Sequence, residues 1–235
     1  MASSGLTSSR LASSPLASSP LAWVGVALLL GGCLQATLEP ASTAAMKPRD
    51  KEYLANPPYE QASIPQPYQR HIVDYHRHEA PGTIVIDTDN RFLYMVQTNG
   101  KAIRYGVTVG EEALGWSGVA KIGTMTEWPS WTPTKSEQER LGPLPAVVPG
   151  GPGNPMGARA MYLFANGKDT LFRIHGTNQP EYIGEAISSG CIRMTNEDVI
   201  DLYSRVKTGS PVVVLAKGSG DSPFPPRSAL SGPAI

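Results

Sequence analysis

The residues best suited to chemistry in this chain are one thiol and one imidazole in the segment HGTNQPEYIGEAISSGCIRMTNED. The chain has two cysteines and four histidines, and only Cys191 and His175 follow the first clear strand signal. A free cysteine is a few per cent thiolate at neutral pH, and a neighbouring imidazolium lowers its pKa while the imidazole transfers the proton. This pairing predicts a thiolate nucleophile, and therefore acyl transfer.

A purely structural role is the alternative, because a lone cysteine is often a small buried hydrophobic residue and a lone histidine can lie in a core. One thiol in the folded region allows neither an internal disulfide nor a zinc site of several thiolates. The flanking glycines favour catalysis. Gly190 permits a tight turn and brings backbone N–H groups close enough to hold an oxyanion. Gly176 permits the chain to turn away after LFRIH and leave the imidazole in a cleft.

The sequence around these residues resembles the catalytic signature of the L,D-transpeptidases of the YkuD type. In that family an upstream histidine is followed, some 15 residues later, by Ser or Thr and then by His, Gly, Cys, a hydrophobic residue and Arg or Asn. This chain has HGT and then SSGCIRM, and departs from the pattern at Ser189, where many members have a second histidine. The resemblance runs from about Pro81 to Leu215 and includes PGTIVIDTDNRFLYMV, YGVTVG, GGPGNPMGARAMYL and RIHGTN.

The resemblance implies that Cys191 is the nucleophile, that His175 donates and accepts the proton, and that Arg193 and Ser189 shape and polarise the site. It implies a peptidoglycan stem tetrapeptide as the substrate, with release of D-alanine and a thioester to the third residue. An amine of a second stem, or of a wall-attached protein, then accepts the acyl group. The alternatives are a carboxypeptidase or endopeptidase that uses water, and a catalytically silent wall-binding lipoprotein. We expect no cofactor and no metal.

The N-terminal segment predicts export. Residues 1–20 are of low complexity with Arg10 as their only charge, and LAWVGVALLLGGC follows. This apolar run is too short to cross a bilayer comfortably and has the length of a signal h-region, roughly 7 to 15 residues. Its end, LGGC, resembles a bacterial lipobox, which implies a lipid anchor on Cys33. The alternative is an ordinary secretory signal cleaved elsewhere. We expect an exported, periplasmic protein attached to a membrane through this lipid.

The charge balance argues against nucleic acid as a partner. Lys plus Arg and Asp plus Glu each number 20, so no basic excess exists to neutralise phosphates, and we expect no nucleic-acid binding. The segment HIVDYHRH contains three histidines, but their spacing fits neither a helical i, i+4 pair nor a usual zinc pattern. A solvated, charged segment is favoured there.

The chain divides into four expected parts. Residues 1–32 form the signal peptide, 33–80 a tether and lead-in rich in Pro, Ala and charges, 81–216 the catalytic domain, and 217–235 a flexible C-terminal tail. A domain of about 135 residues can bury a proper core.

Strands dominate the expected catalytic domain. Hairpins are predicted around Asp89-Asn90, Asn99-Gly100 and Asn166-Gly167, with PVVVLA as a late strand. A helix is expected to begin after Thr195, because Asp198 completes a partial capping box and apolar residues follow on one face. The fold class is therefore mainly β, and the resemblance implies a compact β-sandwich-like domain with a few short helices.

The irregular stretch from Trp128 to Gly157 is long enough to be functional. Trp128 and Trp131 either form a wall of a substrate cleft or cap the core, and the sequence does not separate the two. The run GGPGNPMG lacks the Lys-Ser/Thr ending and the strand-to-helix context of a phosphate loop. A nucleotide site is therefore not expected.

Overall fold

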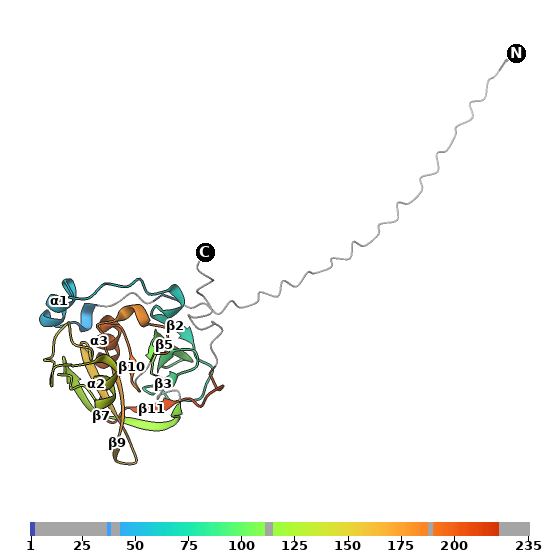
Figure 1. The fold of residues 1–235 in the computed structure, drawn as a ribbon. Coiled ribbons are helices and arrows are strands. Elements are labelled where there is room, and N and C mark those ends of the chain that lie inside the picture. Colours follow the sequence, from blue (N-terminus) through green and yellow to red (C-terminus); the bar gives the residue numbers. More distant parts are fainter. Residues whose placement is uncertain (3–36, 39–42, 111–114, 188–189, 221–235) are drawn as a thin grey trace. The chain divides into compact units, whose positions relative to one another are not determined.

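The computed structural model describes residues 1–2, 37–38, 43–110, 115–187 and 190–220, and strands dominate them (Figure 1). The mainly β class with a few short helices is confirmed. The strands are β1 (Thr37–Leu38), β2 (His71–Asp74), β3 (Ile84–Asp87), β4 (Phe92–Val96), β5 (Lys101–Gly106), β6 (Thr108–Val109), β7 (Gly118–Glu127), β8 (Arg159–Ala165), β9 (Lys168–His175), β10 (Ile192–Arg193) and β11 (Pro211–Val214). The helices are α1 (Pro48–Ala55), α2 (Lys135–Leu141) and α3 (Asn196–Arg205), with short 3-10 turns η1 (Thr43–Ala45), η2 (Gln66–Tyr68) and η4 (Pro180–Tyr182).

Turn residues set the hairpins as predicted. Asn99-Gly100 joins β4 to β5 and Asn166-Gly167 joins β8 to β9, and all four residues have positive φ, between 52° and 75°. Two-residue hairpin turns need this left-handed conformation, which Asn and Gly adopt most easily. Strands β3 and β4 are joined by residues 88–91, where Asn90 donates to the Asp87 carboxylate from its backbone N–H (3.0 Å) and its side-chain amide (2.8 Å).

The strands of the described residues form one sheet in the order β1-β2-β5-β4-β3-β11-β7-β8-β9-β10-β6. Strand β5 ends at Gly106 and β6 begins at Thr108, yet the two lie far apart in this order. The sheet must therefore fold back on itself, and its two halves enclose the core as the layers of a sandwich do. The main core cluster accordingly takes Ile86 and Tyr105 from one half and Met161 and Ile174 from the other.

Strand β7 was not predicted, although it is ten residues long and lies between β11 and β8 in the sheet. Its sequence, GVAKIGTMTE, contains few strongly apolar residues, and only Ala120 and Ile122 are fully buried. A bulge follows at Gly123, where a Cβ would lie 2.3 Å from the Phe164 ring. Glycine therefore serves close packing here while it weakens the strand signal.

The segment before residue 81 contributes to the sheet and to the core. The solvated segment expected at HIVDYHRH is wrong for its first part, because His71–Asp74 form β2 and pair with β5, whereas His76 and His78 are exposed. His71 is 2% exposed, and Val73 and Tyr75 are also buried, so an alternating pattern was hidden by charged neighbours. The exact domain boundaries stay a prediction.

Helix α1 is held by a buried ion pair. Asp50 accepts from the Arg159 guanidinium at 3.0 and 2.6 Å, from Trp128 Nε1 at 2.8 Å and from the Lys47 backbone at 2.9 Å. Both charged side chains are nearly inaccessible, at 0% and 2%. The lead-in helix is thereby joined to β8 and to the start of the 128–157 stretch.

The helix after the cysteine is confirmed as α3. The Thr195 hydroxyl accepts from the Asp198 backbone N–H at 3.2 Å and caps the helix. Val199 and Leu202 are fully buried, and Tyr203 packs against the same core. Across the ranges that the structure describes, no helix has the length and apolar character needed to cross a bilayer. Cys33 lies outside these ranges, as do the predicted signal peptide from residue 3 and the tail from residue 221.

Candidate active site

Strands β9 and β10 bring the predicted catalytic residues to one face of the sheet. The two strands are parallel, with Ile192 opposite Ile174 and Arg193 opposite His175. The two isoleucines are buried in the core at 3% and 0% exposure. Because successive side chains in a strand point to opposite faces, His175 and Arg193 lie on the face away from those isoleucines. Cys191 lies directly before β10, and the same alternation carried one residue back predicts its side chain on that face.

The same alternation places Arg173 there too. Arg173 precedes His175 by two residues, and its guanidinium carbon lies 4.4 Å from the centroid of the Tyr162 ring on the neighbouring strand β8. One thiol, one imidazole and two guanidinium groups therefore share one face of the sheet.

The His175 ring is buried, with 4% exposure, and oriented by the backbone. Its Nδ1 lies 2.6 Å from the carbonyl oxygen of Gly176, which can only accept, so the proton of the neutral ring is on Nδ1. Burial and the charge of Arg193 lower the pKa of this imidazole to about 3, although its bonds to the backbone of Gly176 and Met156 favour the protonated ring. At neutral pH the ring is neutral, with a lone pair on Nε2.

Gly176 serves a close approach rather than the turn that the sequence suggested. A Cβ at this position would lie 2.3 Å from the Asn196 side-chain oxygen and 2.9 Å from the Ala158 backbone nitrogen. No larger residue fits while these two neighbours keep their places.

The Cys191 thiol is half-buried, and its backbone carbonyl accepts from Gly110 at 3.1 Å. Burial raises the pKa of the thiol, and the charge of Glu137 acts in the same direction. The charges of Arg193 and Arg173, and a hydrogen bond with the Arg173 backbone, oppose this rise in the thiol pKa without cancelling it.

The resting state therefore has a neutral thiol at Cys191 and a neutral imidazole at His175. The sequence suggested an imidazolium that lowers the thiol pKa. The structure differs because His175 is buried beside Arg193, and a second positive charge at that place is unfavourable. Such a pair can still react if the imidazole removes the thiol proton as the sulfur attacks.

The other predicted residues are placed as follows. Gly190 is half-buried next to the thiol, and Ser189 lies outside the described residues. Trp128 is 6% exposed and packs edge-to-face on Tyr53 at 4.9 Å, which favours core capping over a cleft wall for this side chain. Trp131 is half-buried and pairs with Val148 through two backbone hydrogen bonds. A role for Trp131 in substrate binding stays a prediction.

Asn196 was missed by the sequence analysis. Its side-chain oxygen accepts from the Ala158 N–H at 2.7 Å, and its amide donates to the Tyr59 hydroxyl and the Thr177 carbonyl at 2.9 Å each. It therefore fixes the segment that follows His175. The only signal was an asparagine directly after a helix cap, and this is common enough to pass unnoticed.

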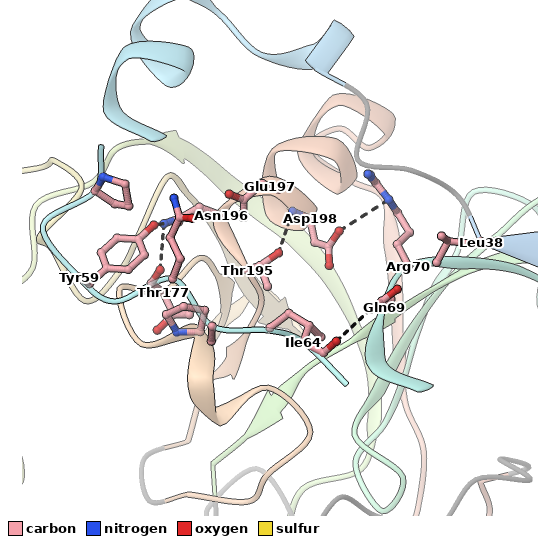
Figure 2. A pocket seen from close by; sticks show the side chains of 14 residues that line it. Leu38, Tyr59, Ile64, Gln69, Arg70, Thr177, Thr195, Asn196, Glu197 and Asp198 are labelled. Atoms are coloured by element: carbon pink, nitrogen blue, oxygen red, sulfur yellow. Dashed lines mark hydrogen bonds and ion pairs between the residues drawn. The ribbon is translucent and has the colours of Figure 1, made fainter. Parts of the chain in front are cut away.

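A cavity of about 410 Å³ lies beside Asn196, between the lead-in segment and the start of α3 (Figure 2). Figure 2 shows Tyr59 and Thr177 meeting at Asn196, with Arg70 and Asp198 facing each other at 3.6 Å further along. Its lining includes neither the thiol nor the imidazole, so it is distinct from the β9–β10 site.

Comparison with known proteins identifies the domain. The model of the YkuD family, described as the L,D-transpeptidase catalytic domain, matches residues 81–214. The Escherichia coli (strain K12) protein "Probable L,D-transpeptidase YbiS" is 34% identical over 139 residues, which cover 56% of this chain and 43% of that protein. "Probable L,D-transpeptidase ErfK/SrfK" of the same strain is 33% identical over 142 residues, covering 57% and 44%.

This chain thus aligns with less than half the length of these two relatives. A crystal structure from Brucella melitensis, described as a "Probable carnitine operon oxidoreductase caia", is 48% identical and covers 70% of this chain and 98% of that one, with a TM-score of 0.42. The family model matches more than half of the sequence, and the chain belongs to the YkuD family of L,D-transpeptidase catalytic domains.

Proposed function

We propose that this protein is a peptidoglycan L,D-transpeptidase in which Cys191 is the nucleophile and His175 is the general base and acid. The observation that supports the proposal is the β9–β10 register, in which Arg193 lies opposite His175; carried one residue back from β10, the strand alternation predicts Cys191 on the same face. The bond from His175 Nδ1 to the Gly176 carbonyl supports it further, because it leaves Nε2 able to accept a proton. The substrate class is taken from the family.

In the first half-reaction, His175 Nε2 takes the thiol proton as the Cys191 sulfur attacks the carbonyl carbon of the third stem residue. The carbonyl becomes an oxyanion, and the imidazole becomes an imidazolium. When the intermediate collapses, the bond to the D-alanine nitrogen breaks and the imidazolium gives its proton to that nitrogen. D-alanine leaves, and the third residue stays attached to the sulfur as a thioester.

In the second half-reaction, an amine of another stem attacks the thioester and gives its proton to His175. The carbon–sulfur bond breaks, the imidazolium returns a proton to sulfur, and a new amide remains. The thioester conserves the free energy of the amide that was broken, so the cross-link needs no nucleotide. An amine on a wall-attached protein could take the same place as acceptor.

The positive side chain of Arg193 suits the negative charge that develops on sulfur and oxygen in this reaction. Arg193 lies opposite His175 in the register and favours the anionic form of the Cys191 thiol. We assign it the stabilisation of negative charge on sulfur and, after attack, on the carbonyl oxygen. Backbone N–H groups at Gly190 and Cys191 are the proposed oxyanion donors. A role for Ser189 stays a prediction.

We further propose that the protein works outside the cytoplasm and is held to a membrane by a lipid on Cys33. This proposal rests on the sequence LAWVGVALLLGGC alone.

The proposed function is tested by incubating the purified protein with a disaccharide-tetrapeptide and identifying the products by mass. We expect dimers joined between third residues, lost in Cys191→Ala and kept in Cys33→Ala, which removes the other cysteine of the sequence. Tripeptide monomers alone would make water the acceptor. Dimers formed by Cys191→Ala would refute the thiolate mechanism.

A further inference from the structure

Strand β9 contains an irregularity directly before the active-site face. Tyr162 of β8 pairs with Arg173, but Phe164 pairs with Asp169, so one residue of β8 is opposed by the three residues 170–172 of β9. Figure 1 shows this hairpin, which carries the β9 label, at the bottom of the domain. Bulges of this kind re-aim a strand, and they are common beside active sites.

The bulge is held in an unfavourable conformation. Leu171 has a φ of 64° and is 76% exposed. Branched, bulky side chains rarely adopt positive φ, and the surrounding structure must stabilise such a residue. The Leu171 N–H donates to the Asp169 carboxylate at 2.8 Å, and the Thr170 hydroxyl donates to the Leu163 carbonyl at 2.7 Å.

An ion pair spans the bulge. The Arg173 guanidinium donates to both carboxylate oxygens of Asp169, at 2.7 and 2.8 Å, and also to the Phe172 carbonyl at 3.0 Å. Its other face lies over the Tyr162 ring. A bidentate pair of this type fixes both orientation and distance, so the two ends of the bulge are clamped together.

The clamped end of the bulge is the residue that lies opposite the cysteine when the β9–β10 register is extended by one residue. The backbone of Arg173 lowers the pKa of the Cys191 thiol, and the only backbone group of Arg173 that can donate to sulfur is its N–H. The parallel register agrees, because one step back from Ile192 opposite Ile174 brings Cys191 opposite Arg173. The bulge therefore determines where this N–H points.

We propose that the Asp169–Arg173 ion pair positions the nucleophile, by closing the β9 bulge so that the Arg173 N–H is held against the Cys191 sulfur. The inference rests on the proposed role of Cys191. Asp169 and Arg173 are positioning residues in this account. They act through a backbone group, and they need not contact the substrate.

The neutralisation of Asp169 separates this proposal from a simple effect of charge. The charges of Arg193, Arg173 and Glu137 act on the thiol, and the His175 imidazole is neutral at neutral pH. If Asp169 mattered only as a nearby negative charge, Asp169→Asn would make the thiolate easier to form. If Asp169 holds the bulge closed, the same variant loosens the N–H contact and makes the thiolate harder to form.

The experiment measures the rate at which iodoacetamide alkylates Cys191 as a function of pH, by intact mass. The full chain carries Cys33→Ala throughout, so that one thiol remains. In Asp169→Asn we expect about ten-fold slower alkylation at neutral pH and a profile moved to higher pH, since a hydrogen bond to a charged group of typical strength is lost. Asp169→Glu, which can still pair with Arg173, should recover part of the rate.

Asp74→Asn is the matched control. It removes an ion pair with Lys101 (2.5 Å) between β2 and β5, and it should leave the alkylation profile unchanged. If Asp169→Asn does not fold, Arg173→Lys serves instead. This variant keeps the positive charge but cannot make the two parallel hydrogen bonds of the guanidinium group, so it should shift the alkylation profile in the same direction. An unchanged profile, or one moved to lower pH, would overturn the proposal.

The two proposals fail separately, because alkylation is measured without the stem peptide. Transpeptidase activity retained by Cys191→Ala would refute the proposed function. That result would leave unchanged the measured effect of the Asp169–Arg173 ion pair on alkylation of the thiol.

Discussion

The buried pair between Asp50 and Arg159 gives a sharp prediction about stability. Asp50→Asn keeps the shape of the side chain but leaves the guanidinium charge without a counter-charge, at a site where the two side chains are 0% and 2% exposed. Removal of one partner of a buried pair typically costs about 3 to 5 kcal/mol. This is a large part of the total stability of a domain, on the order of 5 to 15 kcal/mol.

The loss is measured by urea unfolding followed by tryptophan fluorescence. With a dependence on urea of roughly 2 kcal/mol per molar, a cost of about 4 kcal/mol lowers the midpoint by about 2 M. Glu127→Gln is the control, because Glu127 pairs with Lys47 and Arg49 at the same helix but at the surface. That exposed contact should be worth less than about 1 kcal/mol.

The double variant Asp50→Leu with Arg159→Met examines the reason for the loss. When both charges are removed no unpaired charge stays buried, so most of the stability lost in Asp50→Asn should return. A midpoint for Asp50→Asn within about 0.5 M of the wild type would refute the reasoning. It would mean that water reaches Arg159, or that α1 is not needed for the fold.

Three further predictions concern the site and the N-terminus. Burial lowers the pKa of His175 from 6.5 to about 3, so the contribution of His175 to stability should be constant above pH 6.5 and decrease between pH 6.5 and 3, by up to about 5 kcal/mol. Because Asp198, whose pKa is raised to about 7, also titrates in this range, the measurement is the difference in urea unfolding between the wild type and His175→Asn, which should show this slope. Asn196→Ala should lower turnover of the tetrapeptide about ten- to a hundred-fold through loss of positioning, with an unchanged rate of Cys191 alkylation; equal losses in both assays would contradict this. In cells fed a labelled fatty acid, the label should appear on the wild-type protein and not on Cys33→Ala. Label on both proteins would show that the lipid is attached elsewhere.

The turns and the helix could be predicted because their signals are local. Asn99-Gly100 and Asn166-Gly167 need only their own φ preferences, and Thr195 caps the helix that it precedes. Cys191 and His175 were instead selected by elimination, because few other thiols and imidazoles exist in the sequence, and their catalytic roles stay a prediction.

Features that depend on distant contacts were missed. Strand β7 is polar in sequence and becomes a strand because β11 and β8 pair with it on either side. The pairing of Asp50 with Arg159 joins residues 109 positions apart, and nothing in either neighbourhood indicates it. The protonation state of His175 also depends on burial, which a local pattern does not contain.

The neutral resting pair has a consequence for the proposed reaction. A preformed thiolate would react readily with any electrophile that reached it, whereas a buried thiol of raised pKa reacts slowly at neutral pH unless a carbonyl is aligned for attack as the proton moves to His175. In the proposed mechanism the charge of Arg193 then stabilises negative charge that develops during the reaction, on sulfur and on the carbonyl oxygen. Such stabilisation raises the rate, since it favours the transition state over the resting state. In the proposed mechanism the lowered pKa of His175 therefore contributes to selectivity, because the thiol reacts fastest when a bound substrate accepts the charge.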